Sequence, residues 1–111
     1  MNRDRQFLLD MLVSAKIVVD YVAKRSRVDL ESDLQLQDAV IRRLLIIGEA
    51  SNRISQVTQR NLPTIPWRFI NGMRNRLVHE YDDIDFDIVW DTLQKSLPSL
   101  IIELEKIVKS K

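Results

Sequence analysis

Apolar residues recur every three or four positions along most of the chain, a spacing that gathers them on one face of an α-helix. In the first such segment they are Phe7, Met11, Ala15, Val18 and Val22. The pattern predicts four long helices, at about 3–24, 33–56, 66–79 and 86–108. We therefore expect an all-α protein, folded as an up-and-down bundle of four main helices with short connections.

Capping residues and prolines indicate where these helices begin. Ser32 or Asp33 can accept the free backbone N–H groups at the start of the second helix. Pro66 suits the first turn of the third, because proline has no N–H to leave unpaired there. The stretch before the second helix, SRVDLES (26–32), is polar, and we expect it to be a connector.

The fourth helix contains a proline. Asp85 or Asp87 can cap its start, where a carboxylate also suits the positive end of the helix dipole. Pro98 lies within the apolar pattern and lacks a backbone N–H, so we expect a kink at this point and not a stop.

Two glycines lie inside predicted helices, at Gly48 and Gly72. A glycine in mid-helix costs about 1 kcal/mol relative to alanine, so some other feature should compensate. We expect a close approach of another helix at each. A phosphate cradle is the less favoured interpretation, because neither glycine lies in a glycine-rich loop.

Length and composition limit the possible functions. The chain has 111 residues, a net charge of +1 and no cysteine. This predicts one domain over residues 1–111, with neither disulfides nor thiolate metal sites, and suits the cytoplasm. Nucleic-acid binding would have to use local charge. The start MNRDRQFLLD does not resemble a signal peptide, and the apolar run Leu44–Gly48 is too short to cross a membrane.

The stretch RNRLVHEY (74–81) carries the chain's single histidine and most of its candidate chemistry. Arg74 offers a planar fork of donors for phosphate oxygens, and His79 can carry a proton near neutral pH. Asn75 lies four residues before His79 on the same helix face. The simpler interpretation is that His79 only complements the dipole at a helix end, with Tyr81 as a packing anchor.

One histidine limits what a monomer could catalyse. Cleavage of RNA through its 2′-hydroxyl usually needs a base and an acid, and one imidazole cannot serve as both in a single step. Two copies related by a two-fold axis would bring two histidines and two arginines to one cleft. If the protein is a ribonuclease, we therefore expect a homodimer with a shared site.

Two blocks of sequence resemble the HepT-like proteins, a branch of the HEPN superfamily of small helical ribonucleases. They are DAVIRRLLIIGEAS (38–51) and IPWRFINGMRNRLVHEYDDID (65–85), followed by Val89 and Trp90. The second block contains the family's R-x4-H-x-Y signature, here Arg74, His79 and Tyr81, with Asn75 after the arginine.

This resemblance implies a HEPN-like bundle that dimerises, with the signature lining a cleft between subunits. It implies a metal-independent endoribonuclease without a cofactor, acting as the toxin of a toxin–antitoxin pair. Arg74 and His79 would cleave RNA, Asn75 would position His79 or the substrate, and Arg76 would also position the substrate. The implied partner is a minimal nucleotidyltransferase antitoxin, which adds AMP to the signature tyrosine, here Tyr81.

Other interpretations remain open. The alternative function is a non-catalytic helical module, a nucleotide- or partner-binding subunit in which the signature serves assembly. Arg68 and Arg76 could follow the RNA backbone or form a solvated face, and Arg42 and Arg43 could do so or pair with acids. Trp67 and Trp90 are expected to pack rather than stack on bases. We expect Glu49 to be a structural partner of an arginine.

Overall fold

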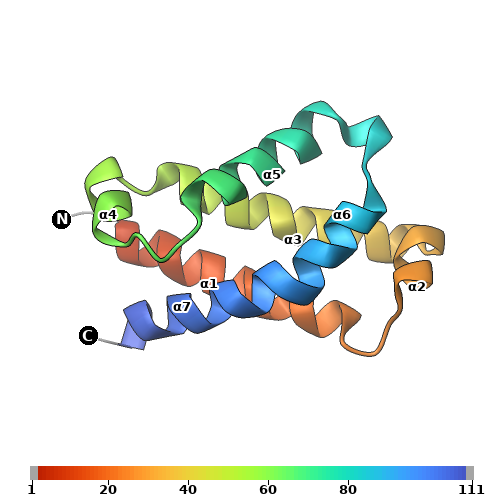
Figure 1. Ribbon diagram of the computed structural model, residues 1–111, viewed down its shortest axis with the longest axis horizontal. Coiled ribbons are helices and arrows are strands. Elements are labelled where there is room, and N and C mark those ends of the chain that lie inside the picture. The colour runs from red at the N-terminus through yellow and green to blue at the C-terminus, as the bar shows by residue number, and fades with distance from the viewer. Residues whose placement is uncertain (1–2, 110–111) are drawn as a thin grey trace.

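The computed structural model describes residues 3–109, and its four long helical segments run alternately up and down (Figure 1). The segments are α1 (Asp4–Val22), α3 (Leu34–Arg53), α5 (Trp67–His79) and the pair α6 (Phe86–Asp91) and α7 (Leu97–Lys109). This confirms the all-α up-and-down bundle expected from the periodicity. The expected domain limits, residues 1 and 111, lie outside the described part of the chain.

Two of the connections are helical, which the polar pattern did not predict. They are α2 (Arg27–Ser32) and α4 (Gln56–Asn61). The prediction of a non-helical connector at 26–32 is therefore wrong. The Ser26 hydroxyl accepts from the Asp29 N–H, and the Asp29 carboxylate accepts from the Ser26 N–H. These reciprocal bonds satisfy two free donors and let even one and a half turns of helix form.

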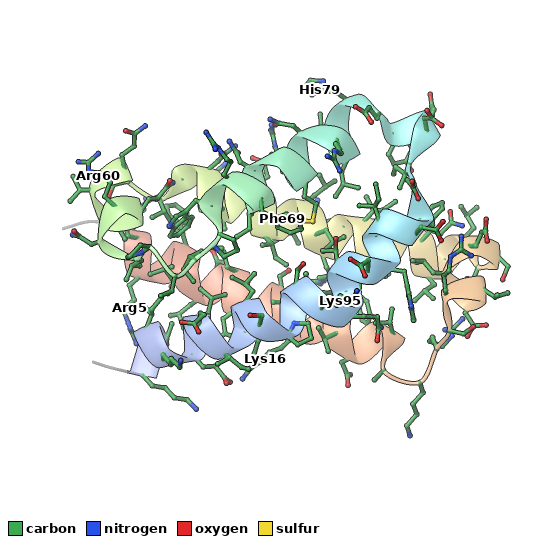
Figure 2. The ribbon with its side chains drawn as sticks, viewed as in Figure 1. Arg5, Lys16, Arg60, Phe69, His79 and Lys95 are labelled. Atoms are coloured by element: carbon green, nitrogen blue, oxygen red, sulfur yellow. The ribbon has the colours of Figure 1, made fainter. Side chains whose placement is uncertain are left out.

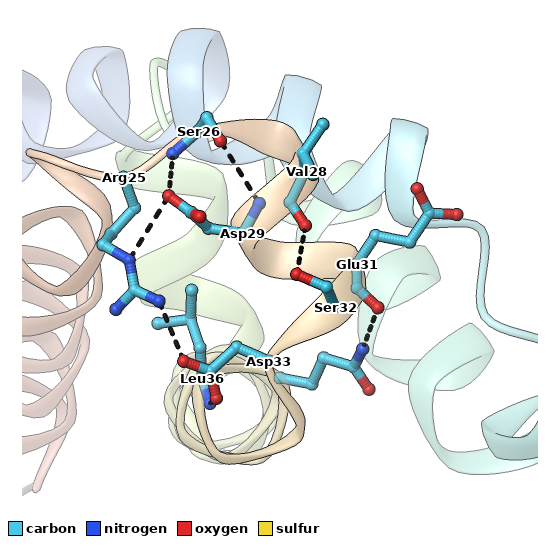
Figure 3. A network of polar contacts seen from close by, with 9 residues as sticks. Arg25, Ser26, Val28, Asp29, Glu31, Ser32, Asp33 and Leu36 are labelled. Atoms are coloured by element: carbon cyan, nitrogen blue, oxygen red, sulfur yellow. Dashed lines mark hydrogen bonds and ion pairs between the residues drawn. The ribbon is translucent and has the colours of Figure 1, made fainter.

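A network of charged groups holds α2 between its neighbours (Figure 3). Arg25 Nη2 lies 2.8 Å from Asp33 Oδ2, and Arg25 Nε lies 3.4 Å from Asp29 Oδ2. The bond from Arg25 lowers the pKa of Asp33, which caps α3 as expected by accepting from the Leu36 N–H. Arg27 pairs with Asp87 and so joins α2 to α6.

The helix continues through Pro98, as expected, but its irregularity comes before the proline. Residues Thr92–Ser96 form a π-helical turn, η2, in which the Leu97 N–H donates to the Thr92 carbonyl five residues back. Pro98 cannot donate a backbone hydrogen bond and its ring crowds the preceding turn. A wider turn just before it accommodates both constraints, so α6 and α7 form one continuous ribbon (Figure 1).

The core lies mainly between α1 and α3. α1 packs on α3 and α7, and α3 packs on α5. The fully buried side chains include Met11, Val18, Leu44, Ile47, Ile70, Leu93 and Leu104. α5 makes its main contacts with α3 and the short 3-10 turn η1 (Tyr81–Asp83), and α7 packs on α1 and η2. Packing is therefore looser between α5 and the continuous helix formed by α6, η2 and α7, called the α6–α7 rod below. Within residues 3–109, no helix is both long and apolar enough to span a membrane.

Gly48 lies where α5 crosses α3. A Cβ atom placed on Gly48 would lie 2.4 Å from Arg74 Cβ and 2.6 Å from Arg74 Cγ. These separations are far below van der Waals contact, so the expectation of a close helix crossing is confirmed. The same expectation at Gly72 is wrong, because a Cβ there would meet no described atom within 4 Å.

A buried carboxylate joins the start of α1 to the start of α4. Asp4 Oδ2 accepts from the Ser55 hydroxyl at 2.7 Å and from the Thr58 hydroxyl at 2.5 Å, and Asp4 Oδ1 accepts from the Ser55 N–H at 3.1 Å. The bond from Thr58, followed by that from Ser55, lowers the pKa of Asp4. This buried contact connects segments that are about fifty residues apart in the sequence.

The two glycines provide a matched pair for stability measurements. Gly48→Ala should lower the free energy of unfolding by roughly 1–3 kcal/mol, because the added methyl overpacks the crossing. Gly72→Ala should raise it by up to about 1 kcal/mol, because alanine favours a helix and the space is open. Urea denaturation at one protein concentration measures both. Equal stability of the two variants would contradict the close crossing.

Asp4→Asn should destabilise the fold most near neutral pH, by roughly 1–3 kcal/mol. Because the folded pKa lies below the ordinary value of 3.8, the charged carboxylate contributes stability above that value and loses it as the pH falls through the folded pKa. The difference between wild type and variant should therefore shrink below about pH 4. Thr58→Val, which removes the strongest donor, should reduce the same pH-dependent part. A difference independent of pH would contradict this account.

Candidate functional site

α5 presents the signature residues. The helix begins after Pro66, and Ile70 and Leu77 are its buried residues. It ends at His79, where the Glu80 N–H still donates to the Arg76 carbonyl. Tyr81 then begins the 3-10 turn η1. Arg74 is thus held in the middle of the helix, with His79 at its last position.

Arg74 is fixed by two acceptors. Glu49 Oε2 accepts from Arg74 Nε at 2.8 Å and lies 2.7 Å from Arg74 Nη2. Asn75 Oδ1 accepts from Arg74 Nη1 at 3.1 Å. The Arg74 side chain is 25% exposed and that of Glu49 is 46% exposed, so the pair lies at the surface with the arginine stem covered. This confirms that Glu49 is the structural partner of an arginine.

His79 and Tyr81 are exposed and stand apart from this cluster. Figure 2 shows His79 at the outer edge of the molecule, projecting away from the other helices. Tyr81 is 57% exposed. Within residues 3–109, neither side chain makes a hydrogen bond or an ion pair. Asn75 accepts a hydrogen bond from Arg74 and makes none with His79, so a single chain brings together Arg74 and Asn75 but gives the imidazole no hydrogen-bond partner within residues 3–109.

Arg76 lies on a different side of α5 from the Arg74–Glu49 pair. It lines a cavity of about 510 Å³ beside α6, where α5 and the α6–α7 rod are loosely joined. Leu44, Leu77 and Val89 are buried residues of its lining, and Phe69 and Ile88 are exposed ones. The sequence pattern did not predict this cavity. Its signals were apolar residues outside the buried stripe, Phe69 and Ile88, and the glycine of α5.

The charged lining of this cavity carries both signs. The lining includes the arginines Arg68 and Arg76 and the carboxylates Glu80, Asp83 and Asp85. The Asp85 carboxylate also caps α6, as expected, by accepting from the Asp87 N–H at 2.9 Å. This mixture does not select anions in the way that a wholly basic surface would.

The remaining candidates have structural or solvent-exposed positions. Trp67 is half-buried and donates from Nε1 to the Leu62 carbonyl at 3.0 Å, and Trp90 is half-buried against the core, so both pack as expected. Arg42 is exposed, and Arg43 lies 3.5 Å from the Ser14 hydroxyl. The expected pairing of these arginines with acids is not found among the described residues.

The side-chain chemistry of the site suits an anionic substrate. Arg74 has N–H donors left over for phosphate oxygens, and His79 is accessible for proton transfer. No group of three or more histidine, aspartate or glutamate side chains in the described part of the chain could hold a metal ion. The fold and the site together define a small helical protein that carries an arginine and an exposed histidine on one helix near the surface.

Comparison with known proteins identifies the family. The family model described as "Ribonuclease HepT-like" matches residues 11–107. A protein from Thermococcus cleftensis named "Probable ribonuclease HepT" is 35% identical over 105 residues, covering 95% of this chain and 96% of its own. The chain therefore belongs to the HepT-like ribonuclease family.

Two further relatives extend over nearly the whole chain. One from Caldanaerobacter subterraneus subsp. tengcongensis is 35% identical over 109 residues, covering 98% of this chain and 94% of its own, and carries an RNase name. One from Methanocaldococcus jannaschii, also with an RNase name, is 33% identical over 105 residues, covering 95% and 87%. No solved structure matches the chain significantly.

Proposed function

We propose that the protein is a metal-independent endoribonuclease whose active site forms between two copies of the chain. The observation that carries the proposal is the arrangement of Arg74 and His79. Arg74 is held in place with donors to spare, whereas His79 stands exposed at a helix end and makes no hydrogen bond or ion pair with residues 3–109. Membership of a ribonuclease family supports RNA as the substrate.

RNA cleavage requires one proton to be removed from the 2′-hydroxyl and another to be added to the 5′-oxygen that leaves. A base removes the proton of the 2′-hydroxyl, the 2′-oxygen attacks the adjacent phosphorus, and the bond to the 5′-oxygen breaks. An acid protonates that leaving oxygen, which leaves a 2′,3′-cyclic phosphate. His79 of each subunit would supply one of these roles. Arg74 would bind the phosphate and stabilise the charge that develops on it, and Asn75 would help to position substrate.

Arg76 has a more distant role in this proposal. It faces the cavity beside α6 rather than the side of α5 that carries Arg74. We propose that it contacts RNA beyond the cleaved phosphate, because an arginine can follow the backbone without joining the reaction. In the proposed assembly, two copies of the chain form a homodimer, and RNA is cleaved in the cleft that they share.

Tyr81 fits a regulatory role. We propose that the chain is the toxin of a cytoplasmic toxin–antitoxin pair, and that a minimal nucleotidyltransferase antitoxin adds AMP to Tyr81. The phenolic oxygen would attack the α-phosphorus of ATP and release pyrophosphate. The exposure of Tyr81 and its place two residues after His79 support this role. The added phosphodiester would bring negative charge and bulk to the edge of the site and repel RNA.

Mixing subunits tests catalysis and the shared site together. His79→Ala alone should reduce RNA cleavage by about 10²–10⁴-fold, in buffer with or without a chelator, because general acid–base catalysis is lost. After subunits exchange in an equal mixture of wild type and variant, activity should fall to about a quarter of that of wild type at the same total concentration, because only dimers with two histidines are complete. Activity of about half would indicate independent sites.

The arginines provide the control. Arg74→Ala should lower cleavage by about 10²–10³-fold, to a rate that can still be measured, because stabilisation of the charge on the phosphate is lost. Arg60→Ala makes the same change of charge on α4, away from His79 (Figure 2), and should leave cleavage unchanged. Circular dichroism checks that each variant is folded. A folded wild type that cleaves no RNA, is free of AMP by intact mass and binds the transferase tightly would favour the non-catalytic alternative.

Tyrosine substitutions test the modification. Co-expression with the transferase should add the mass of AMP to wild type and to Tyr21→Phe, but not to Tyr81→Phe. Tyr21 is the chain's other tyrosine and is also exposed, so it controls for simple accessibility. Intact mass spectrometry measures the outcome. An unchanged mass increase in Tyr81→Phe would exclude Tyr81 as the acceptor.

A further inference from the structure

The crossing of α3 and α5 brings Arg74 against two consecutive residues of α3. At Gly48, the absence of a side chain lets the Cβ and Cγ atoms of Arg74 rest where a Cβ atom would otherwise lie. At Glu49, the carboxylate meets the guanidinium of the same side chain. One residue therefore positions the stem of Arg74 and its neighbour positions the charged head.

The way in which Glu49 binds determines which donors stay free. Its Oε2 atom accepts from Nε at 2.8 Å and contacts Nη2 at 2.7 Å, which occupies the side edge of the guanidinium. Asn75 takes one further donor on Nη1 at 3.1 Å. An arginine has five N–H donors, so one on Nη1 and one on Nη2 remain. These two can still form the paired bonds that a phosphate accepts.

We propose that Glu49 is a positioning residue that orients Arg74 for the scissile phosphate. This inference rests on the ribonuclease activity proposed above. A free arginine must restrict several rotatable bonds when it grips a phosphate. Glu49 imposes that restriction before RNA arrives, so the guanidinium is already in place when charge develops in the transition state.

The charge of Glu49 separates positioning from other roles. A carboxylate next to an arginine weakens the local attraction for RNA. Removing it should therefore strengthen RNA binding, even as the loss of orientation slows the chemical step. If Glu49 only stabilised the fold, its removal would reduce the amount of active protein. It would not strengthen RNA binding while slowing the chemical step. If Glu49 instead competed with RNA for Arg74, its removal would slow neither RNA binding nor cleavage.

Steady-state kinetics on Glu49→Ala and Glu49→Gln provide the main test. We expect Glu49→Ala to lower kcat by about tenfold to a hundredfold while KM stays equal or falls, because a misplaced group costs this much. Glu49→Gln keeps an acceptor oxygen and should recover part of the loss. Glu31→Ala is the matched control, since Glu31 pairs with Arg27 in a similar ion pair at α2. It should leave kcat and KM unchanged.

Two further measurements connect the effect to Arg74. In an Arg74→Ala background, Glu49→Ala should cause no additional loss of kcat, because its target is gone. The Nε–H signal of Arg74 in ¹H–¹⁵N NMR spectra should be protected from exchange in wild type and lose that protection in Glu49→Ala. The NMR measurement does not depend on catalysis.

Each outcome has a distinct meaning. An unchanged or raised kcat in Glu49→Ala, or an equal loss in the Arg74→Ala background, would overturn the positioning role. If Arg74→Ala is impaired as expected and Glu49→Ala is fully active, only this inference fails. If Arg74→Ala and His79→Ala cleave RNA as well as wild type does, the proposed function fails instead.

Discussion

The crossing of α5 over α3 determines where the candidate site lies and which way it faces. Gly48 removes the side chain that would otherwise separate the two helices, and the stem of Arg74 occupies the space. The side of α5 at the crossing carries Arg74, with Asn75 beside it, and another side faces α6 across a cavity. The close contact at Gly48 therefore sets how near Arg74 lies to α3.

The rest of the bundle supports that crossing from behind. α1 packs along α3 and also on α7, so α3 is the central element to which both α1 and α5 attach. Local polar contacts fix the ends of the connections, at Asp4 with Ser55 and at Asp29 with Ser26. The packing between α5 and the α6–α7 rod is looser, which accounts for the cavity between them. The tightly packed side of the molecule is thus formed by α1, α3 and α7, and the open cavity lies on the other side, between α5 and α6.

Much of the fold was predictable because helical periodicity is a local property. The long helices, the caps at Asp33 and Asp85 and the passage of the last helix through Pro98 agree with the expectations. The two short helices were missed. Each is too short to show an apolar period, and α2 depends on a capping box within a polar stretch. The π-helical turn was also not predicted, since it is a response of the surrounding helix to the proline.

The candidate site, like the fold, was predictable in part from the sequence. The sequence alone determined which residues are the candidates for the chemistry, because Arg74, His79 and Tyr81 lie at the signature spacing in one short stretch. It also indicated a close crossing at Gly48 and an arginine partner for Glu49. Only the tertiary structure decided that both features meet at Arg74, that Gly72 faces open space and that Arg76 points elsewhere. Spacing within one helix gives angles about its own axis, whereas contact between helices depends on how their surfaces fit together.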